Sequence, residues 1–280
     1  MILFLHVPGG ICTCMTDGSA QYPAKKLVLN LVKEAEQPIP ANVLVRLAQV
    51  FGIEANNVRV TLNRLVGQGL LELTDRGVYE LGPEARGLAR QQSHWRSLED
   101  ELIPWDGRWL AIYVAHLGRR DRTQLRQRER VTEMWGFRAL QQGLLIRPAN
   151  FRLRTEEVTE ALHDLGLERE ALVFTASDFQ GPDPVAAGLW PVAELNNQYR
   201  ELTQQMTTWL ENYPDFSLED AARECFLIGD RVLREIAFDP RLPDEMADTA
   251  ARREMVETMC LFDDVGKAIW AELIAQLSRN

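Results

Sequence analysis

The stretch from Lys26 to Gly87 constrains the fold most, because three helical patterns of apolar residues follow one another at close spacing. The first pattern contains Leu27, Leu31 and Val32, and prolines at positions 38 and 40 end it near Glu36, since proline cannot continue a helix. The second pattern runs from Val43 to Phe51 and meets a glycine at position 52, which can take the left-handed conformation that closes a helix.

The third pattern is followed by a hairpin. Val58, Leu62, Leu65 and Val66 form its apolar face, and Asn56 is the expected N-cap. Two segments of strand-like alternation, 70–73 and 78–81, then flank a turn at 74–77. Three helices followed by a two-stranded hairpin predict a winged helix-turn-helix, with the hairpin as the wing.

The outer face of the third predicted helix is polar, and the side chains there can hydrogen-bond phosphates or base edges. The candidate DNA contacts are Asn57, Arg59, Thr61, Asn63, Arg64 and Gln68 on the helix, with Arg76 at the wing tip. The alternative interpretation is a small helical domain whose polar face is merely solvated. Because residues 23–90 hold nine Lys and Arg against seven Asp and Glu, one copy would bind phosphate weakly, so we expect a homodimer on a palindromic operator in double-stranded DNA.

The middle of the chain alternates strands and helices. Strands are expected at 109–115, 137–140, 144–147 and 172–176, and helices at 119–135 and 155–166. The order β-α-β-β-α-β is that of the ferredoxin-like split unit.

The last third of the chain reads as helical, with helices expected at 189–213, 218–238 and about 244–278 and with Ser217 capping the second. The fold class is therefore α+β. The expected divisions are a flexible N-terminal extension at 1–22 (Met15 being a possible start), a winged module at 23–92, a ferredoxin-like domain at 104–180 and a helical domain at 186–280.

Charge is distributed unevenly along the chain. Residues 105–154 hold eleven bases against four acids, whereas residues 155–280 hold ten against twenty-six, within a total net charge of −10. A basic middle can add phosphate contacts, and an acidic end would face away from DNA or contact other proteins.

Four features together resemble the PaaX-type transcriptional regulators over residues 24–277. They are the winged module, the segment Trp105-Asp106-Gly107-Arg108-Trp109, the segment from Gly136 to Pro148, and Asp239-Pro240-Arg241-Leu242-Pro243. The recognition helix of that family matches Val58-Arg59 and Leu62-Asn63-Arg64-Leu65-Val66, and the end of its wing matches Tyr79, Leu81, Pro83 and Gly87. The sequence departs from the family in a less basic wing tip and in lacking the usual tryptophan and glycine within 247–253.

The resemblance implies a repressor of an aromatic-acid catabolic operon that leaves DNA when an acyl-CoA thioester such as phenylacetyl-CoA binds. We expect this effector between the central and helical domains, with Trp105, Arg108, Trp109, Arg126, Arg128 and Trp190 as candidate ligand-binding residues. Core packing is the alternative role of the tryptophans, including Trp135. The arginines between 119 and 130 can instead touch flanking DNA or form a solvated helix face.

Other function classes find less support. The central domain also resembles the ferredoxin-fold nucleases of CRISPR adaptation, but Tyr113-Val114-Ala115-His116 lacks their metal-binding aspartate. His6, His94, His116 and His163 stand apart from other ligand types, and the cysteines at 12, 14, 225 and 260 lack zinc spacing, so neither catalysis nor a metal or cofactor is expected. No membrane span or secretory signal is recognised, so a cytoplasmic location is expected. A non-catalytic adaptor that uses the winged module for protein or RNA contacts is the alternative function.

Overall fold

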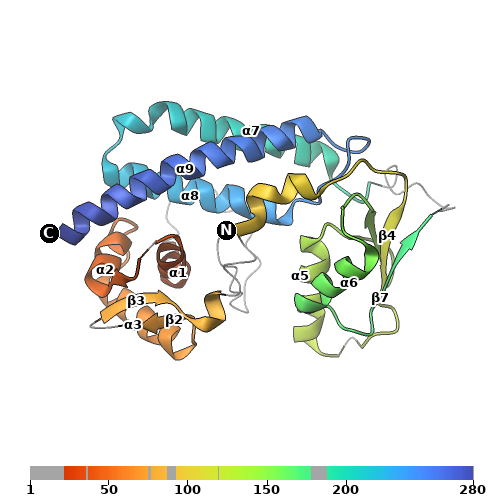
Figure 1. Ribbon diagram of the computed structural model, residues 1–280, viewed down its shortest axis with the longest axis horizontal. Coiled ribbons are helices and arrows are strands. Elements are labelled where there is room, and N and C mark those ends of the chain that lie inside the picture. Colours follow the sequence, from red (N-terminus) through yellow and green to blue (C-terminus); the bar gives the residue numbers. More distant parts are fainter. Residues whose placement is uncertain are drawn as a thin grey trace. The chain divides into compact units, whose positions relative to one another are not determined.

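The computed structural model describes residues 22–35, 37–74, 77–86, 93–118, 120–177 and 188–279 (Figure 1). The expectations for residues 1–21 of the N-terminal extension, including His6, Cys12, Cys14 and Met15, and those for Arg76, Gly87 and Arg119 lie outside these residues. The chain divides into two compact units. Unit 1 comprises 1–95, 205–234 and 259–280, and unit 2 comprises 96–204 and 235–258.

The N-terminal part of unit 1 contains three α-helices and a small sheet. The elements are α1 (Ala24–Glu34), β1 (Ile39–Pro40), α2 (Ala41–Gln49), α3 (Ala55–Gly67), β2 (Leu71–Leu73) and β3 (Val78–Leu81). The three helices and both hairpin strands confirm the elements predicted from the apolar spacing. Glu54, rather than Asn56, occupies the N-cap position of α3, and its side chain makes no cap hydrogen bond.

Strand β1 was not predicted. It pairs antiparallel with β3, opposite Tyr79 and Val78, so the sheet order is β1-β3-β2. The two prolines at positions 38 and 40 do end α1 as expected, but the residues between the helices also complete the sheet. This pairing joins segments about forty residues apart, which local propensity does not encode.

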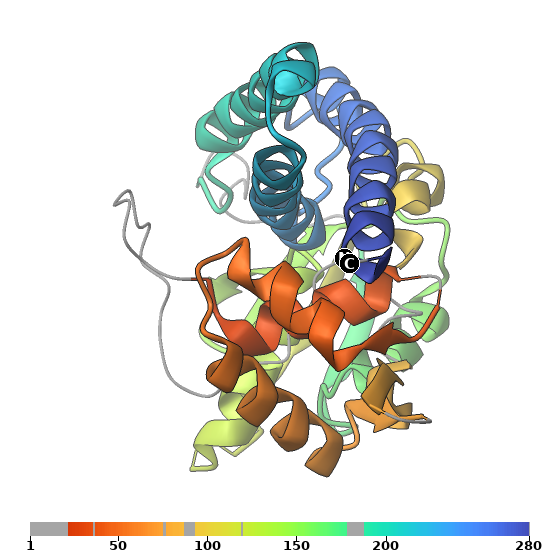
Figure 2. The same cartoon turned by 90° about the vertical axis from the view of Figure 1, so that its left-hand side faces the viewer.

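Helix α1 is buried along its whole middle. Six consecutive residues, 27–32, are at most 5% exposed, so no side of this helix faces water. The C-terminal end of α9 lies beside α2, as Figures 1 and 2 show, and Arg46 of α2 donates a hydrogen bond of 2.8 Å to the carbonyl oxygen of Leu277. Lys26 of α1 forms an ion pair of 2.6 Å with the buried carboxylate of Asp230 on α8.

Three long helices form the C-terminal third of the chain: α7 (Val192–Asn212), α8 (Leu218–Phe238) and α9 (Thr249–Arg279), with a short 3-10 turn, η3 (Tyr213–Asp215), between the first two. Ser217 caps α8 as predicted, because its hydroxyl accepts a hydrogen bond of 3.1 Å from the Asp220 amide. The last helix begins five residues later than predicted. The Asp248 carboxylate accepts from the Ala251 amide at 3.0 Å and so supplies the helix start, and this hydrogen bond lowers the pKa of Asp248.

Unit 2 contains a four-stranded antiparallel sheet. Its elements are η2 (Ser93–Glu101), a 3-10 helix that begins within unit 1, then β4 (Trp109–Tyr113), α5 (Arg122–Met134), β5 (Arg138–Gln141), β6 (Leu144–Pro148), α6 (Thr155–Asp164) and β7 (Leu172–Ala176). The predicted order β-α-β-β-α-β is confirmed, and the strand order in space is β5-β6-β4-β7. The first strand is two residues shorter than predicted, and helix α5 begins at Arg122 rather than 119.

Each face of this sheet has its own core. On the face toward α5 and α6, Leu110 and Ile112 of β4 pack with Val131, Val158 and Leu162. On the other face, the alternate β4 residues Trp109 and Ala111 pack with residues that come from far along the chain: Trp190, Leu242 and Met246. The sheet is therefore buried on both sides around Trp109 and Ala111.

Two of the segments that carry the family resemblance meet in unit 2. Gly136 has a φ of +75° and lies so close to residue 240 that a Cβ on it would stand 2.7 Å from the Pro240 Cα. Arg147 is fully buried and donates a hydrogen bond of 2.9 Å to the side-chain oxygen of Asn150. The Asn150 side-chain nitrogen in turn donates a hydrogen bond of 2.9 Å to the carbonyl oxygen of Arg241. The 136–148 and 239–243 segments are thus held together by backbone contact and by hydrogen bonds.

Helix α5 is fixed by an ion pair between the buried Arg128 and the half-buried Glu168. The guanidinium of Arg128 donates to both carboxylate oxygens of Glu168, at 3.0 and 3.1 Å from Nε, and to the Gly118 carbonyl oxygen at 3.3 Å. Burial alone would raise the pKa of Glu168, but the hydrogen bonds from Arg128 and the backbone outweigh it, so the pKa is lowered.

Replacing Gly136 with alanine should destabilise unit 2 by at least about 3 kcal/mol, because an L residue is strained at this φ and its Cβ would overlap the Pro240 backbone. Gly107→Ala is the matched control. Gly107 also has a positive φ, +87°, but a Cβ there meets nothing within 4 Å, so only the strain of about 1 kcal/mol applies. Urea unfolding followed by tryptophan fluorescence measures both, and equal losses would refute the close contact as the cause.

Replacing Arg128 with alanine should cost about 3 kcal/mol of unfolding free energy, because it leaves the half-buried Glu168 carboxylate without its partner. Arg126→Ala removes the same charge from an exposed position of α5 and should change stability by less than about 0.5 kcal/mol. The pKa of Glu168 is lowered in the folded protein. The difference in unfolding free energy between wild type and Arg128→Ala should therefore be largest above pH of about 4.3, and it should shrink as the pH falls through the folded pKa. A difference that does not depend on pH would contradict the ion pair.

Candidate functional site: the exposed face of α3

Helix α3 presents a polar surface opposite its core face. Val58, Leu62 and Leu65 are at most 1% exposed and fix which side of the helix faces inward. The predicted contacts that lie exposed on the other side are Asn57, Arg59, Asn63, Arg64 and Gln68. Three turns of one helix therefore offer two guanidinium groups and three side-chain amides to a partner.

Two residues of α3 were assigned to the wrong face. Thr61 is only 4% exposed, and its hydroxyl lies 3.4 Å from the Asn57 side-chain oxygen, so it belongs to the inner half of the helix. Val66, predicted on the apolar face, is 36% exposed. Val60 is 59% exposed in the middle of the polar face, where an apolar side chain can contact a thymine methyl group.

Arg59 and Arg64 have no acidic partner among the described residues of the chain. By contrast, Arg86 is held by Glu72 of β2 and Glu80 of β3, at 2.6 and 2.8 Å. The charges of the two α3 arginines thus remain available to a phosphate or a base edge.

The structure adds Lys25, which the sequence interpretation missed. Its ammonium group donates 3.2 Å to the Gln68 side chain, although the two residues lie 43 positions apart. Burial lowers the pKa of Lys25, and the nearby charge of Arg64 lowers it further. The start of α1 and the end of α3 therefore form one basic corner, and its only signal in the sequence was a lysine beside the first helical pattern.

The tryptophans proposed as ligand walls are packed against one another. Trp109 and Trp190 are 6% and 3% exposed, and their rings stack 6.1 Å apart, while Trp105 meets Trp109 edge to face at 5.0 Å. The indole nitrogen of Trp190 donates 3.0 Å to the Gly136 carbonyl oxygen, and Trp135 packs edge to face on Phe151. These contacts favour the alternative role, core packing.

The arginines proposed to grip phosphates differ in burial. Arg126 is exposed, but Arg128 is buried against Glu168, and Arg130 is half-buried, with burial lowering its pKa. Arg108 is exposed and held by Asp106 at 2.7 Å. Burial therefore withdraws Arg128 and Arg130 from the predicted row, whereas Arg120, Arg122 and Arg126 remain exposed.

Within the described ranges no group of three or more His, Cys, Asp and Glu side chains is placed to hold a metal ion. His116 is engaged by the carbonyl oxygen of Glu170 at 2.8 Å. No helix in the described part of the chain is long and apolar enough to cross a membrane.

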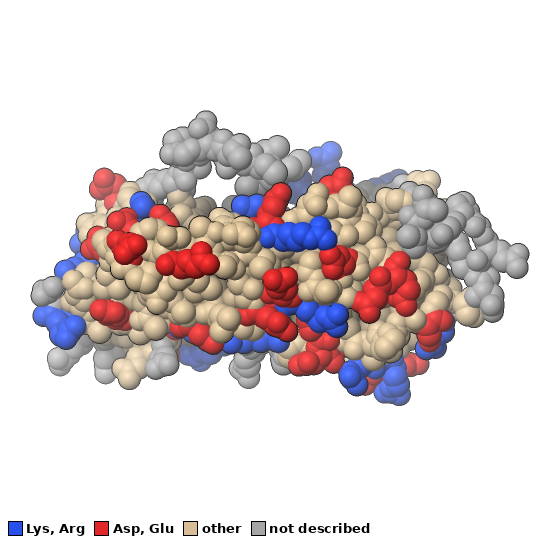
Figure 3. Space-filling view, turned by 90° about the horizontal axis from the view of Figure 1, so that it is seen from above, with Lys and Arg blue, Asp and Glu red and all other residues tan. Residues whose placement is uncertain are grey.

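Acidic side chains are spread over the face of the molecule that carries α7 and α9, with basic groups between them (Figure 3). This agrees with the excess of acids in residues 155–280. Such a face is unsuited to a polyanion.

Comparisons with known proteins cover nearly the whole chain. Family models match in three successive segments: a PaaX-like protein at residues 27–85, a PaaX protein central Cas2-like domain at 103–187, and a PaaX-like protein C-terminal domain at 190–272. A solved structure, an uncharacterized protein Rv0674 from Mycobacterium tuberculosis, is similar in fold, with a TM-score of 0.56 and 23% identity over 87% of this chain and 98% of that one. No curated protein matches significantly.

The three family segments follow one another in the order in which the sequence motifs occur, and together they confirm the resemblance drawn from those motifs. The chain belongs to the PaaX family.

Proposed function

We propose that this chain is a DNA-binding transcriptional regulator whose α3 reads the major groove of a palindromic operator. The observation that carries the proposal is the exposed face of α3, where Arg59 and Arg64 have no acidic partner among the described residues. Three helices and a hairpin in this order support a winged helix-turn-helix, with α3 as its recognition helix. Lys25 would add a phosphate contact at the edge of the same surface.

The sheet of unit 2 supports a ferredoxin-like central domain. Its strand order, β5-β6-β4-β7 with every neighbouring pair antiparallel, is what the split β-α-β-β-α-β unit produces, and both helices pack on one face. In this proposal the central domain is a rigid connector and carries no reaction, so the protein is not an enzyme.

The proposed assembly is a homodimer, because one module has too little positive charge to hold DNA alone. Leu227 on α8 and Leu261 on α9 are 41% and 64% exposed, which supports pairing through the C-terminal helices. Family membership suggests regulation of phenylacetic acid degradation, and we propose repression that is relieved by an aryl-acyl-CoA effector. A ligand that moves nearly all dimers off DNA must prefer one state about 10⁴-fold.

Substituting Arg59 or Arg64 with alanine should weaken binding of the full-length protein to its own upstream region by about 5- to 150-fold each, because each removes a charge-assisted contact. A gel shift repeated over a series of salt concentrations measures the effect. If the lost contact is to a phosphate, the slope of log affinity against log salt should also fall by about 1.

Arg223→Ala is the control. It removes the same charge from α8, where Arg223 pairs with Asp220 at 3.2 Å, and should leave the affinity unchanged. Equal affinity for wild type, Arg59→Ala and Arg64→Ala would remove α3 from the interface. Failure of the wild type to shift any nearby promoter would favour the alternative, an adaptor that uses this module for protein or RNA contacts.

A further inference from the structure

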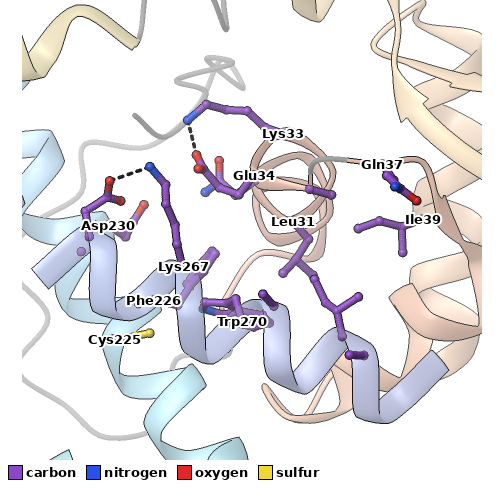
Figure 4. A pocket seen from close by; sticks show the side chains of 18 of the residues that line it. Leu31, Lys33, Glu34, Gln37, Ile39, Cys225, Phe226, Asp230, Lys267 and Trp270 are labelled. Carbon is purple, nitrogen blue, oxygen red and sulfur yellow. Dashed lines mark hydrogen bonds and ion pairs between the residues drawn. The ribbon is translucent and has the colours of Figure 1, made fainter. Parts of the chain in front are cut away.

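Unit 1 contains a cavity of about 730 Å³ between its N-terminal elements and its C-terminal helices (Figure 4). Leu31 of α1 and Ile39 of β1 line one side, and Phe226 of α8 and Trp270 of α9 line the other. The volume lies within the range of small-molecule sites, roughly 300–1,000 Å³. This is not the place between the central and helical domains where the sequence led us to expect an effector.

The walls of the cavity are mostly apolar and aromatic. Phe226 and Trp270 meet edge to face with ring centroids 5.9 Å apart, and Met259 and Phe262 continue the lining along α9. Cys225 also faces the cavity, and burial raises the pKa of its thiol to about 12, so it is neutral at physiological pH. Such a wall suits an aromatic ring, which gains from edge-to-face contacts as well as from burial.

Every charged group on the lining already has a counter-charge. Lys33 pairs with Glu34 at 2.6 Å, and Lys267 pairs with Asp263 at 2.8 Å. Asp230 Oδ2 accepts hydrogen bonds from Lys26 at 2.6 Å and from Arg234 at 3.0 Å. With three acids and two lysines on the lining, all of them paired, a phosphate or another multiply charged anion finds no unpaired cation there.

We propose that this cavity is the effector site of the regulator and that it takes an uncharged aryl group. The proposal rests on the proposed function and gives it a location and a ligand class. The aryl group can belong to a free aromatic compound or to the acyl end of a thioester, whose phosphates would then remain outside the cavity.

The position of the cavity gives the ligand a route to the DNA-binding surface. Ile39 pairs with Tyr79, so the β1 wall is part of the same sheet as the β2-β3 hairpin, and α1 packs directly against α3. The opposite walls, α8 and α9, are the helices proposed to pair in the dimer. A ligand that contacts both sides can therefore favour one setting of the recognition helix relative to these helices.

The test is direct binding of phenylacetamide, a neutral aryl probe, to the full-length protein by isothermal titration calorimetry, without DNA. Ala271→Trp and Ala275→Trp place a bulky ring at two exposed α9 positions that line the cavity. Ala268→Trp, also exposed on α9 but not on the lining, is the matched control. We expect the control to bind like wild type and both lining variants to bind at least 10-fold more weakly.

Phenylacetyl-CoA and coenzyme A alone distinguish the source of the aryl group. If both phenylacetamide and the thioester bind and both lose affinity in Ala271→Trp, the cavity accepts a free or an esterified aryl group. Binding of the thioester alone, with the same loss, assigns the thioester as the source. Absence of binding by both aryl probes, affinity unchanged in both lining variants, or binding of coenzyme A alone that the lining variants abolish would overturn the proposal.

The two proposals fail separately. Arg59→Ala should bind phenylacetamide like wild type although it has lost DNA affinity, because Arg59 lies on α3 and does not line the cavity. A protein that binds aryl probes in the cavity and no promoter would refute the regulator, whereas one that shifts its promoter and binds no aryl probe would refute the cavity.

Discussion

A helix that is buried on every side needs partners on every side, and α1 is such a helix. Its residues 27–32 are covered by α2, α3 and β3 and by the C-terminal helices of the same unit. Burial of its five aliphatic side chains contributes roughly 1.5–3 kcal/mol each to the folding free energy of unit 1. The exposed face of α3, the β2-β3 hairpin and the cavity are all positioned by elements that pack on α1.

Much of the N-terminal module could be predicted from the sequence, because helices with one apolar face reveal themselves by periodicity. The hairpin was also predicted, from the alternation of apolar and polar residues in its two strands and from the turn residues between them. Strand β1 was not, since two residues between prolines carry no periodic signal and become a strand only through Tyr79 and Val78. Thr61 was predicted on the exposed face because threonine is polar. Its position in the helix places it on the inner face, where its methyl group packs like a small apolar side chain.

The site was predicted less well than the fold, for a physical reason. A run of arginines looks the same in sequence whether each guanidinium faces water or an acid, and the acid that buries Arg128 lies forty residues away at Glu168. The aromatic residues around position 105–109 likewise find their partner at Trp190. The cavity, by contrast, is lined by α1, β1, α8 and α9, which come from the two ends of the chain. The sequence pattern of each element alone does not indicate that they line a common cavity.

The ion pair between Lys26 and Asp230 joins the first helix to residues two hundred positions later. Residues 205–234 and 259–279, which follow the boundary expected after residue 92, belong to the same compact unit as this helix. A fragment cut there would lose the counter-charge of Lys26 and expose the aliphatic flank of its own central helix to water. The N-terminal helices of this chain therefore depend for their stability on α8 and α9, which come from the opposite end of the sequence.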